Sequence, residues 1–401
     1  MHANRPLRIV IGADTFPPDI NGAARFAHQL ATGLAGRGHE VHVICSSATG
    51  PAGRETLLGH GGSVTVHRLR SHRTPCHPTF RICLPWRTGS AVRELLGELA
   101  PDLVHVQAHF SVGRALVRAA TEAGIPVAAT NHFMPENLLG YLPLPDAVRR
   151  GVATLAWRDL ARVLAPARLV TAPTPTAVAM LREHRVGGRV LPVSCGVDLD
   201  RLGAGAGTPT GRTVLFVGRL DQEKRVSDLL HALALLPERL DVRVELVGDG
   251  SCRAELEVLA QRLGVADRVR FHGFVSETEL LAAHARSAVF CMPGVAELQS
   301  IATMEAMAAG RPVVAADAVA LPHLVRPGRN GWLFPPGDAA ALAAALIRLF
   351  DEPGALSRMG AASRELIARH DLHASLARFE SLYADVLGRP VARPEPVEQV
   401  A

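Results

Sequence analysis

Short apolar runs alternate with amphipathic stretches through the first half of the chain. Residues 23–37 repeat apolar positions at helical spacing and are followed by Gly38, and residues 90–100 repeat that pattern. The apolar runs between such stretches have the length of strands and occupy residues 7–14, 40–46, 63–69, 102–107 and 125–132. Alternation of this kind predicts a doubly wound parallel sheet.

The same alternation begins again after residue 212. Residues 201–212 (RLGAGAGTPTGR) are rich in Gly, Ala, Thr and Pro, as linkers are, and strand-like runs follow at 213–220 and 242–250. We therefore expect an α/β protein with two Rossmann-like, doubly wound parallel-sheet domains that face a cleft, where open α/β sheets bind ligands. Residues 331–338 (GWLFPPGD) suggest a hairpin-like segment. The predicted divisions are an N-terminal domain at 1–200, the linker at 201–212, a C-terminal domain at 213–370, a last helix at 371–388 and a disordered, Pro-rich tail at 389–401.

The composition of the chain also indicates where in the cell the protein is expected. The 401 residues hold no apolar run near the roughly 18 residues of a membrane-spanning helix. The N-terminal MHANRPLRIVIGAD enters the first predicted strand without the basic, apolar and small-residue succession of a secretory signal. We expect a cytoplasmic protein. The six cysteines lack the spacing of metal ligands, so reduced structural thiols and no metal are expected.

Charge is uneven along the chain. Residues 1–196 contain 21 Arg and 12 acidic residues, a net of +9, and residues 197–401 contain 22 basic and 26 acidic residues, a net of −4, which together give +5. The basic half suggests an anionic partner, and a solvated Arg-rich surface is the alternative. Of the 43 Lys and Arg residues, only Lys224 is a lysine. Because an ammonium is a compact point charge and a guanidinium a planar fork, this lone lysine points to a specific use.

The segment 293–312 (PGVAELQSIATMEAMAAGRP) carries the clearest candidate chemistry. Glu297 follows an apolar strand, and Glu305 lies eight residues later inside the next predicted helix. The start of that helix offers free backbone N–H groups to an anion such as a diphosphate. A glutamate in so apolar a helix needs a partner. We therefore place Glu297 near a sugar and Glu305 on the ribose hydroxyls of a nucleotide.

Three strand-to-helix turns support a phosphate site. In VGRLDQEKR (217–225), Arg219 and Lys224 can neutralise a leaving diphosphate. The turn VGDG (247–250) and the Gly22 loop in FPPDINGAAR (16–25) allow close backbone approach to a ligand. The dinucleotide fingerprint G-x-G-x-x-G is absent from the Gly22 loop.

These segments together resemble the retaining glycosyltransferases of family 4, which have the GT-B fold. The matching elements are the Gly22 loop, GRLDQEK, VGDG, the pair Glu297 and Glu305, and EAMAAGRPVVA, over about residues 7–388. The resemblance implies a retaining, metal-independent hexosyltransferase without a cofactor, whose donor is a UDP- or GDP-linked sugar. It implies that Arg219 and Lys224 contact the diphosphate, Glu297 the hexose and Glu305 the ribose. The donor-binding residues implied in addition are Gly22, Gly248, Asp249, Phe274, Leu298, Gln299, Ser300 and Ile301. The last helix, 371–388, would cross back to the N-terminal domain.

The sequence departs from that family pattern at two places. Ser300 stands where many relatives have Gly, and Gln107 stands at the second histidine of the V-H-x-H element in VHVQAHFSVG (104–113). The histidine near the reacting centre is therefore open among His105, His109 and His132, and we take His109 and His132 with Glu297 as catalytic candidates. Each histidine could equally be structural.

The acceptor is the least defined part of the expectation. Basic and aromatic residues suited to a membrane interface occur at Arg68, Arg70, Arg73, Phe80, Arg81, Trp86 and Arg87, and again at Arg149, Arg150, Trp157, Arg158 and Arg162. The sequence around Glu297 is similar to relatives that glycosylate lipids such as diacylglycerol. We expect a lipid acceptor at an anionic membrane, with peripheral association at the inner face of the plasma membrane. The alternatives are a soluble acceptor, a sugar-nucleotide epimerase of the same fold, or a binding module. No nucleic-acid recognition motif accompanies the basic half.

Overall fold

The computed structural model describes residues 6–59, 61–74, 77–135, 145–203, 209 and 211–389. The chain forms two compact units. Unit 1 contains Met1–His132, Leu155–Val193 and His373–Ala401, and unit 2 contains Phe133–Thr154 and Ser194–Leu372. Each unit is built on its own sheet, and each is described by itself below.

Unit 1 is built on an eight-stranded sheet in the order β10-β9-β8-β7-β1-β2-β4-β3. Its central strands are buried along nearly their whole length, as parallel strands covered on both faces must be. Only β3 (Gly53–Leu58), at the edge, runs antiparallel to its neighbour. The other strands are β1 (Arg8–Ala13), β2 (Glu40–Ser46), β4 (Ser63–Leu69), β7 (Leu103–Val106), β8 (Val127–Thr130), β9 (Leu169–Ala172) and β10 (Val190–Pro192).

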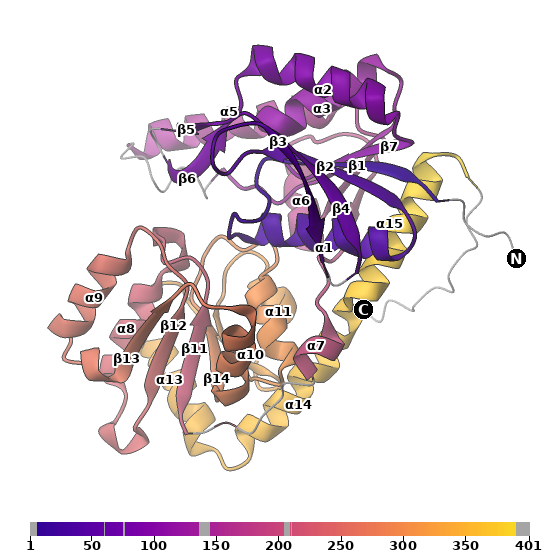
Figure 1. The fold of residues 1–401 in the computed structure, drawn as a ribbon. Coiled ribbons are helices and arrows are strands. Elements are labelled where there is room, and N and C mark those ends of the chain that lie inside the picture. Colours follow the sequence, from indigo (N-terminus) through magenta and orange to yellow (C-terminus); the bar gives the residue numbers. More distant parts are fainter. Residues whose placement is uncertain are drawn as a thin grey trace, which may run out of the picture. The chain divides into compact units, whose positions relative to one another are not determined.

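Helices cover both faces of this sheet. In Figure 1, α2 (Pro85–Leu99) and α3 (Ser111–Glu122) lie on one face, and α1 (Gly22–Gly36) and α15 (Leu372–Val386) lie on the other. The last helix packs tightly on α1, because a Cβ at Gly33 would lie 2.5 Å from Leu376 Cδ1. The final helix thus returns to the N-terminal unit, as the sequence predicts. Unit 1 also includes α6 (Pro175–Glu183) and the C-terminal part of α5 (Asp146–Leu164).

Unit 2 is built on a six-stranded, fully parallel sheet in the order β13-β12-β11-β14-β15-β16. This is the 3-2-1-4-5-6 order of a Rossmann fold. The strands are β11 (Thr213–Val217), β12 (Arg243–Val247), β13 (Val269–Gly273), β14 (Val289–Met292), β15 (Val313–Ala316) and β16 (Gly331–Phe334). The helices are α7 (Leu199–Gly203), α8 (Val226–Leu235), α9 (Arg253–Arg262), α10 (Glu277–Arg286), α11 (Ile301–Ala308), α12 (Leu321–Leu324), α13 (Ala339–Asp351) and α14 (Ala355–Ile367).

Two doubly wound parallel sheets confirm the predicted fold class, and two local expectations were wrong. Residues 331–338 do not form a hairpin, because β16 extends the sheet parallel to β15. The region from Arg68 to Arg87, which we took for a loop when placing its basic and aromatic residues at a membrane, contains an antiparallel pair, β5 (His72–Thr74) and β6 (His77–Ile82). Half of the predicted linker, residues 204–208 and 210, and the tail from residue 390 lie outside the described residues.

Candidate functional site

The segment that carries Glu297 and Glu305 runs from the end of β14 into α11. Ser300 begins the helix as its N-cap, since its hydroxyl accepts from the backbone N–H of Thr303 at 3.4 Å. The N-terminus of α11 therefore follows directly after the loop that holds Glu297. Leu298, Gln299 and Ile301 are all buried, so the loop is anchored rather than free. We call residues 297–301 the donor loop.

Lys224 and Glu297 form an ion pair in unit 2, although they are 73 residues apart in the chain. Lys224 closes a short turn after β11, and the backbone N–H of Val295 donates to Glu223 O at 2.9 Å, which joins this turn to the donor loop. Both side chains are largely shielded, with 16% and 11% of their surfaces exposed. The structure thus brings together two segments that the sequence singled out separately.

Arg219 lies in the same turn and is held by two carboxylates. Its guanidinium donates to Asp221 at 2.7 Å and to Glu223 at 2.6 Å. Asp221 also accepts from the backbone N–H of Ser251 at 2.9 Å, which ties the Arg219 turn to the turn after β12. These acidic partners were not among the predicted site residues, although both stand in the quoted segment 217–225, because the sequence does not show which way their side chains turn.

The glycines of VGDG serve the packing of two turns. A Cβ at Gly248 would lie 2.0 Å from the carbonyl oxygen of Gly218, and one at Gly250 would lie 2.6 Å from the backbone of Leu220. Gly248 also has φ +125°, which disfavours any other residue. Asp249 lies in this turn and pairs with Arg253 at 3.2 Å. Close backbone packing, rather than an open cradle, therefore accounts for the glycines.

Glu305 lies inside α11 with 2% of its side chain exposed. Its Oε1 is 3.6 Å from a guanidinium nitrogen of Arg201, which lies on α7 and also pairs with Glu277 of α10. Arg201 was expected in the linker, and here it is the cation beside the buried glutamate. Phe274, which the resemblance implies as a donor-binding residue, follows β13 and is 61% exposed.

The histidine candidates lie in unit 1 and differ in their surroundings. His105 is a core residue, since its ring nitrogens contact the Tyr383 hydroxyl at 2.6 Å and the Thr130 hydroxyl at 2.8 Å. His132 Nε2 lies 3.2 Å from Gln107 Oε1, so the residue that replaces the family histidine is a direct neighbour. His109 is buried 4.0 Å from Asp159.

Burial keeps these histidines neutral. It lowers the pKa of His105 to about 3 and the pKa values of His109 and His132 to about 4.

Gly22, the remaining predicted donor-binding residue, is the exposed first residue of α1. It directly follows the N-cap Asn21, whose side chain accepts from the backbone N–H of Ala24.

Sequence comparison places this geometry in a family. A model described as Glycosyltransferase Family 4 matches residues 20–201, and one described as Glycosyl transferases group 1 matches residues 211–352. The GDP-mannose-dependent alpha-mannosyltransferase of Mycolicibacterium smegmatis is 30% identical over 394 residues, which covers 96% of this chain and 98% of that protein. The chain belongs to the family 4 glycosyltransferases. It is a hexosyltransferase with the GT-B fold.

Two further similarities extend the comparison. The phosphatidyl-myo-inositol mannosyltransferase of Mycobacterium leprae is 36% identical to this glycosyltransferase, with 89% of this chain and 91% of that protein covered. The structure of sucrose-phosphate synthase from Thermosynechococcus elongatus matches with a TM-score of 0.79 at 21% identity, and covers 95% of this chain and 99% of that one. The two-sheet architecture is therefore shared well beyond the range of clear sequence similarity.

The surface residues expected at a membrane do not all face solvent. Trp157 is 4% exposed and stacks on His184, with ring centroids 4.2 Å apart, so its place in a lipid-facing patch was wrong. Arg68 pairs with Glu55 at 2.6 Å, and Arg81 donates to Ser71 at 2.7 Å. The side chain of Phe80 lies outside the described residues. No helix in the described part of this glycosyltransferase is both long and apolar enough to cross a bilayer.

Proposed function

We propose that this glycosyltransferase moves a hexose from a nucleotide sugar to a hydroxyl of a membrane lipid, with retention of anomeric configuration and without a metal ion. The observation that carries the proposal is the Lys224–Glu297 pair, which joins the cationic turn to the donor loop. Lys224 and Arg219 then bind the diphosphate, Glu297 the hexose and Glu305 the ribose. GDP-mannose is the first donor to test, because the relative in M. smegmatis is named as dependent on it.

The chemistry follows from the charges at this site. The bond from the anomeric carbon to the diphosphate oxygen breaks, and the acceptor oxygen bonds to the same face of that carbon. The proton of the acceptor hydroxyl passes to the leaving phosphate oxygen. The cations at residues 219 and 224 stabilise the charge that develops on the diphosphate, a type of stabilisation that often dominates catalysis. Burial lowers the pKa values of His109 and His132 to about 4, so either histidine would act as a neutral hydrogen-bonding group rather than as a cation.

The donor and mechanism are tested by one set of assays. The purified protein is incubated with GDP-mannose or UDP-glucose and a phosphatidylinositol or diacylglycerol acceptor, with and without EDTA, and the product is examined by NMR. We expect an α-linked product that forms equally well with EDTA. A β-linked product or loss of activity with EDTA contradicts the mechanism. A changed free sugar nucleotide without acceptor would indicate an epimerase, and turnover of a soluble alcohol alone would indicate a soluble acceptor.

The lipid acceptor is supported by two exposed groups of residues and by one relative. The relative in M. leprae is named for a phosphatidyl-myo-inositol acceptor. Trp86, at the start of α2, is 71% exposed beside Ile82 and the exposed Arg87. On α5, the exposed apolar residues Val148, Val152 and Leu155 recur at helical spacing among exposed arginines. Apolar side chains flanked by arginines suit an anionic lipid surface.

Vesicle flotation tests this surface. With vesicles of phosphatidylcholine and phosphatidylglycerol at low salt, we expect the protein to float, and Trp86→Ser to reduce the bound fraction several-fold. The matched control is Leu235→Ser, which removes an exposed leucine of unit 2 and should leave binding unchanged. Absence of flotation by the unmodified protein would contradict peripheral association.

A further inference from the structure

The side chain of Gln299 is tied to the chain segment 194–196. It is 8% exposed, its Oε1 accepts from the backbone N–H of Cys195 at 2.8 Å, and its Nε2 donates to the Ser194 hydroxyl at 3.1 Å. Both the oxygen and the nitrogen of the Gln299 side-chain amide are therefore hydrogen-bonded to protein groups. A buried amide held this way fixes the backbone that carries it.

Ser194 passes this connection on to His370. Its Oγ accepts from Gln299 and from the backbone N–H of Gly196 at 3.2 Å, and lies 2.9 Å from His370 Nδ1. The Ser194 hydroxyl has one proton and two acceptors within reach, Gln299 Oε1 at 3.4 Å and His370 Nδ1 at 2.9 Å. We assign the proton to the shorter contact, so that Ser194 donates to an unprotonated Nδ1. The tautomer of His370 assigned here therefore carries its proton on Nε2. The network needs His370 to be neutral.

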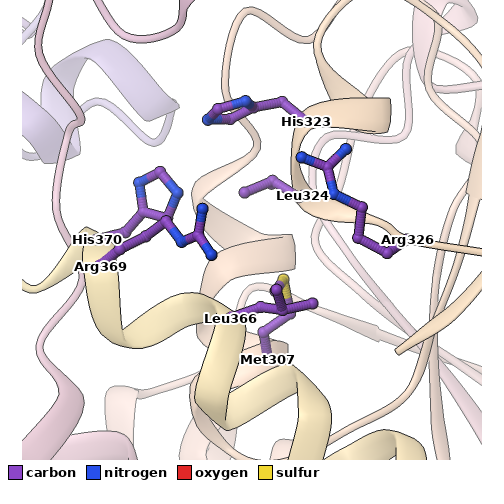
Figure 2. A pocket seen from close by; sticks show the side chains of 7 residues that line it. All are labelled: Met307, His323, Leu324, Arg326, Leu366, Arg369 and His370. Carbon is purple, nitrogen blue, oxygen red and sulfur yellow. The ribbon is translucent and has the colours of Figure 1, made fainter. Parts of the chain in front are cut away.

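A basic pocket surrounds the other side of His370. Figure 2 shows Arg326 and Arg369 turned toward the space between His323 and His370, above Met307 and Leu366. Among the described residues that line this pocket there is no carboxylate. Burial, together with the nearby His323 and Arg369, lowers the pKa of His370 to about 4. On the adjoining helix α14, Glu365 is paired with Arg329 at 2.7 Å. The pocket keeps the imidazole neutral over the physiological range.

His370 and Ser194 also lie where the chain enters and leaves unit 2, whose long segment runs from Ser194 to Leu372. The backbone N–H of Val197 donates to His370 O at 2.9 Å, and that of Leu372 donates to Val197 O at 3.0 Å. The two crossing segments are therefore bonded to each other, and Gln299 joins the donor loop to this pair.

We propose that Gln299 is a positioning residue, which holds the donor loop in its binding geometry through Ser194 and the neutral His370. The effect of this restraint on donor binding rests on the proposed function, because the restrained loop carries Glu297. The physical claim, that the amide restrains residues 297–301, holds for the protein without substrate and is measured separately.

Four variants of the full-length protein test the restraint. Gln299→Leu and Ser194→Ala remove the connection, Ser194→Thr keeps the hydroxyl, and Ser287→Ala is the matched control. Ser287 is a fully buried serine of unit 2 whose hydroxyl donates to His284 O at 3.0 Å. Hydrogen–deuterium exchange of peptides covering residues 297–301 reports the loop directly, and steady-state kinetics with the active donor reports KM and kcat.

We expect Gln299→Leu and Ser194→Ala to raise exchange of the donor loop about ten-fold and the donor KM by a similar factor. The kcat at saturating donor should change less, and Ser194→Thr should restore both values. In the unmodified protein, exchange corrected for its intrinsic pH dependence should stay constant from about pH 8 to 5 and increase as His370 is protonated near pH 4.

The outcomes separate the two proposals. Donor-loop exchange in Ser194→Ala equal to that in Ser287→Ala would overturn the positioning role, whatever the activity. Faster loop exchange in a protein that uses no nucleotide sugar would leave the restraint established and would contradict the proposed function. Faster exchange with an unchanged donor KM would overturn the link between the restraint and donor binding.

Discussion

Replacement of Glu305 by alanine should weaken nucleotide binding more than ten-fold. The carboxyl group is 98% shielded inside α11, with an Arg201 guanidinium nitrogen 3.6 Å away, so it is held in place and dehydrated before any ligand arrives. A hydrogen bond from a neutral hydroxyl to a charged, buried acceptor contributes about 1.5–3 kcal/mol. One such bond to a ribose hydroxyl corresponds to roughly 10- to 150-fold in affinity.

Isothermal titration with GDP and UDP measures this loss, and deoxy analogues show its origin. The unmodified protein should bind the 2′-deoxy or 3′-deoxy nucleotide more weakly than the ribonucleotide, by a factor similar to the effect of Glu305→Ala. Glu305→Ala itself should bind the ribonucleotide and the deoxynucleotide equally well, because the acceptor of the missing hydroxyl is gone.

Arg201 supplies the control for this prediction. Removal of Glu305 leaves Arg201 with one carboxylate partner fewer, and this alone could disturb α7 and α11. Glu277→Ala removes a second carboxylate partner of Arg201 and leaves the third, Asp198. The Glu277 side chain is 49% exposed, and its removal should change nucleotide affinity less than two-fold. Unchanged affinity in Glu305→Ala, or a deoxy effect that persists in that variant, would refute the ribose contact.

Three further predictions follow from the structure. Lys224→Ala should reduce the transfer rate at saturating donor more than Lys224→Arg, and equal losses in initial-rate assays would argue against an ammonium-specific role. Gly248→Ala should lower the free energy of unfolding by at least about 2 kcal/mol more than Gly264→Ala in urea titrations, because both have positive φ but only residue 248 meets a neighbouring backbone. Stability should also fall as pH decreases from about 6.5 to 4. Burial lowers the pKa of His105 to about 3, so the unfolded state takes up this proton first, which costs up to ~1.4 kcal/mol per pH unit. His105→Gln should show a shallower pH dependence, and an equal slope would contradict this assignment.

Much of the fold could be predicted because its strands are apolar along their whole length. Parallel strands covered on both faces, such as β14 and β15, leave a run of apolar residues that no loop would tolerate. The edge strand β3 has no such signature, since nearly all of its residues are exposed, and β16 was mistaken for a hairpin because Pro335 and Pro336 follow it directly. The strands at the edges of the two sheets are therefore the ones that the apolar pattern did not predict correctly.

The candidate site divides in the same way. Lys224 and Glu297 could be named from sequence because each lies in a recognisable turn after a buried strand. Arg201, Asp221 and Ser194 could not, because each takes part through a contact made only after folding. Asp221 stands in the quoted segment 217–225, but its bond to Ser251 is not visible in the sequence, and Arg201 and Ser194 stand in no motif. Gln299 shows the limit most clearly. Its position in the donor loop could be predicted, while the direction of its side chain, toward Ser194 and Cys195, is set by the chain segment that packs beside it.

The pairing of Lys224 with Glu297 gives a geometric reason why this position is a lysine rather than an arginine. An ammonium carries three N–H bonds that point in different directions, so one can bond to Glu297 while another is directed at a phosphate oxygen. A guanidinium places its donors in one plane and tends to engage a carboxylate with two parallel bonds, which would direct the fork at Glu297 and away from a second anion. In the same turn, the guanidinium of Arg219 donates to the carboxylates of Asp221 and Glu223. Under the proposed function, Lys224 bonds to the Glu297 carboxylate and to a diphosphate at once, and a planar guanidinium is unsuitable for that pair of contacts.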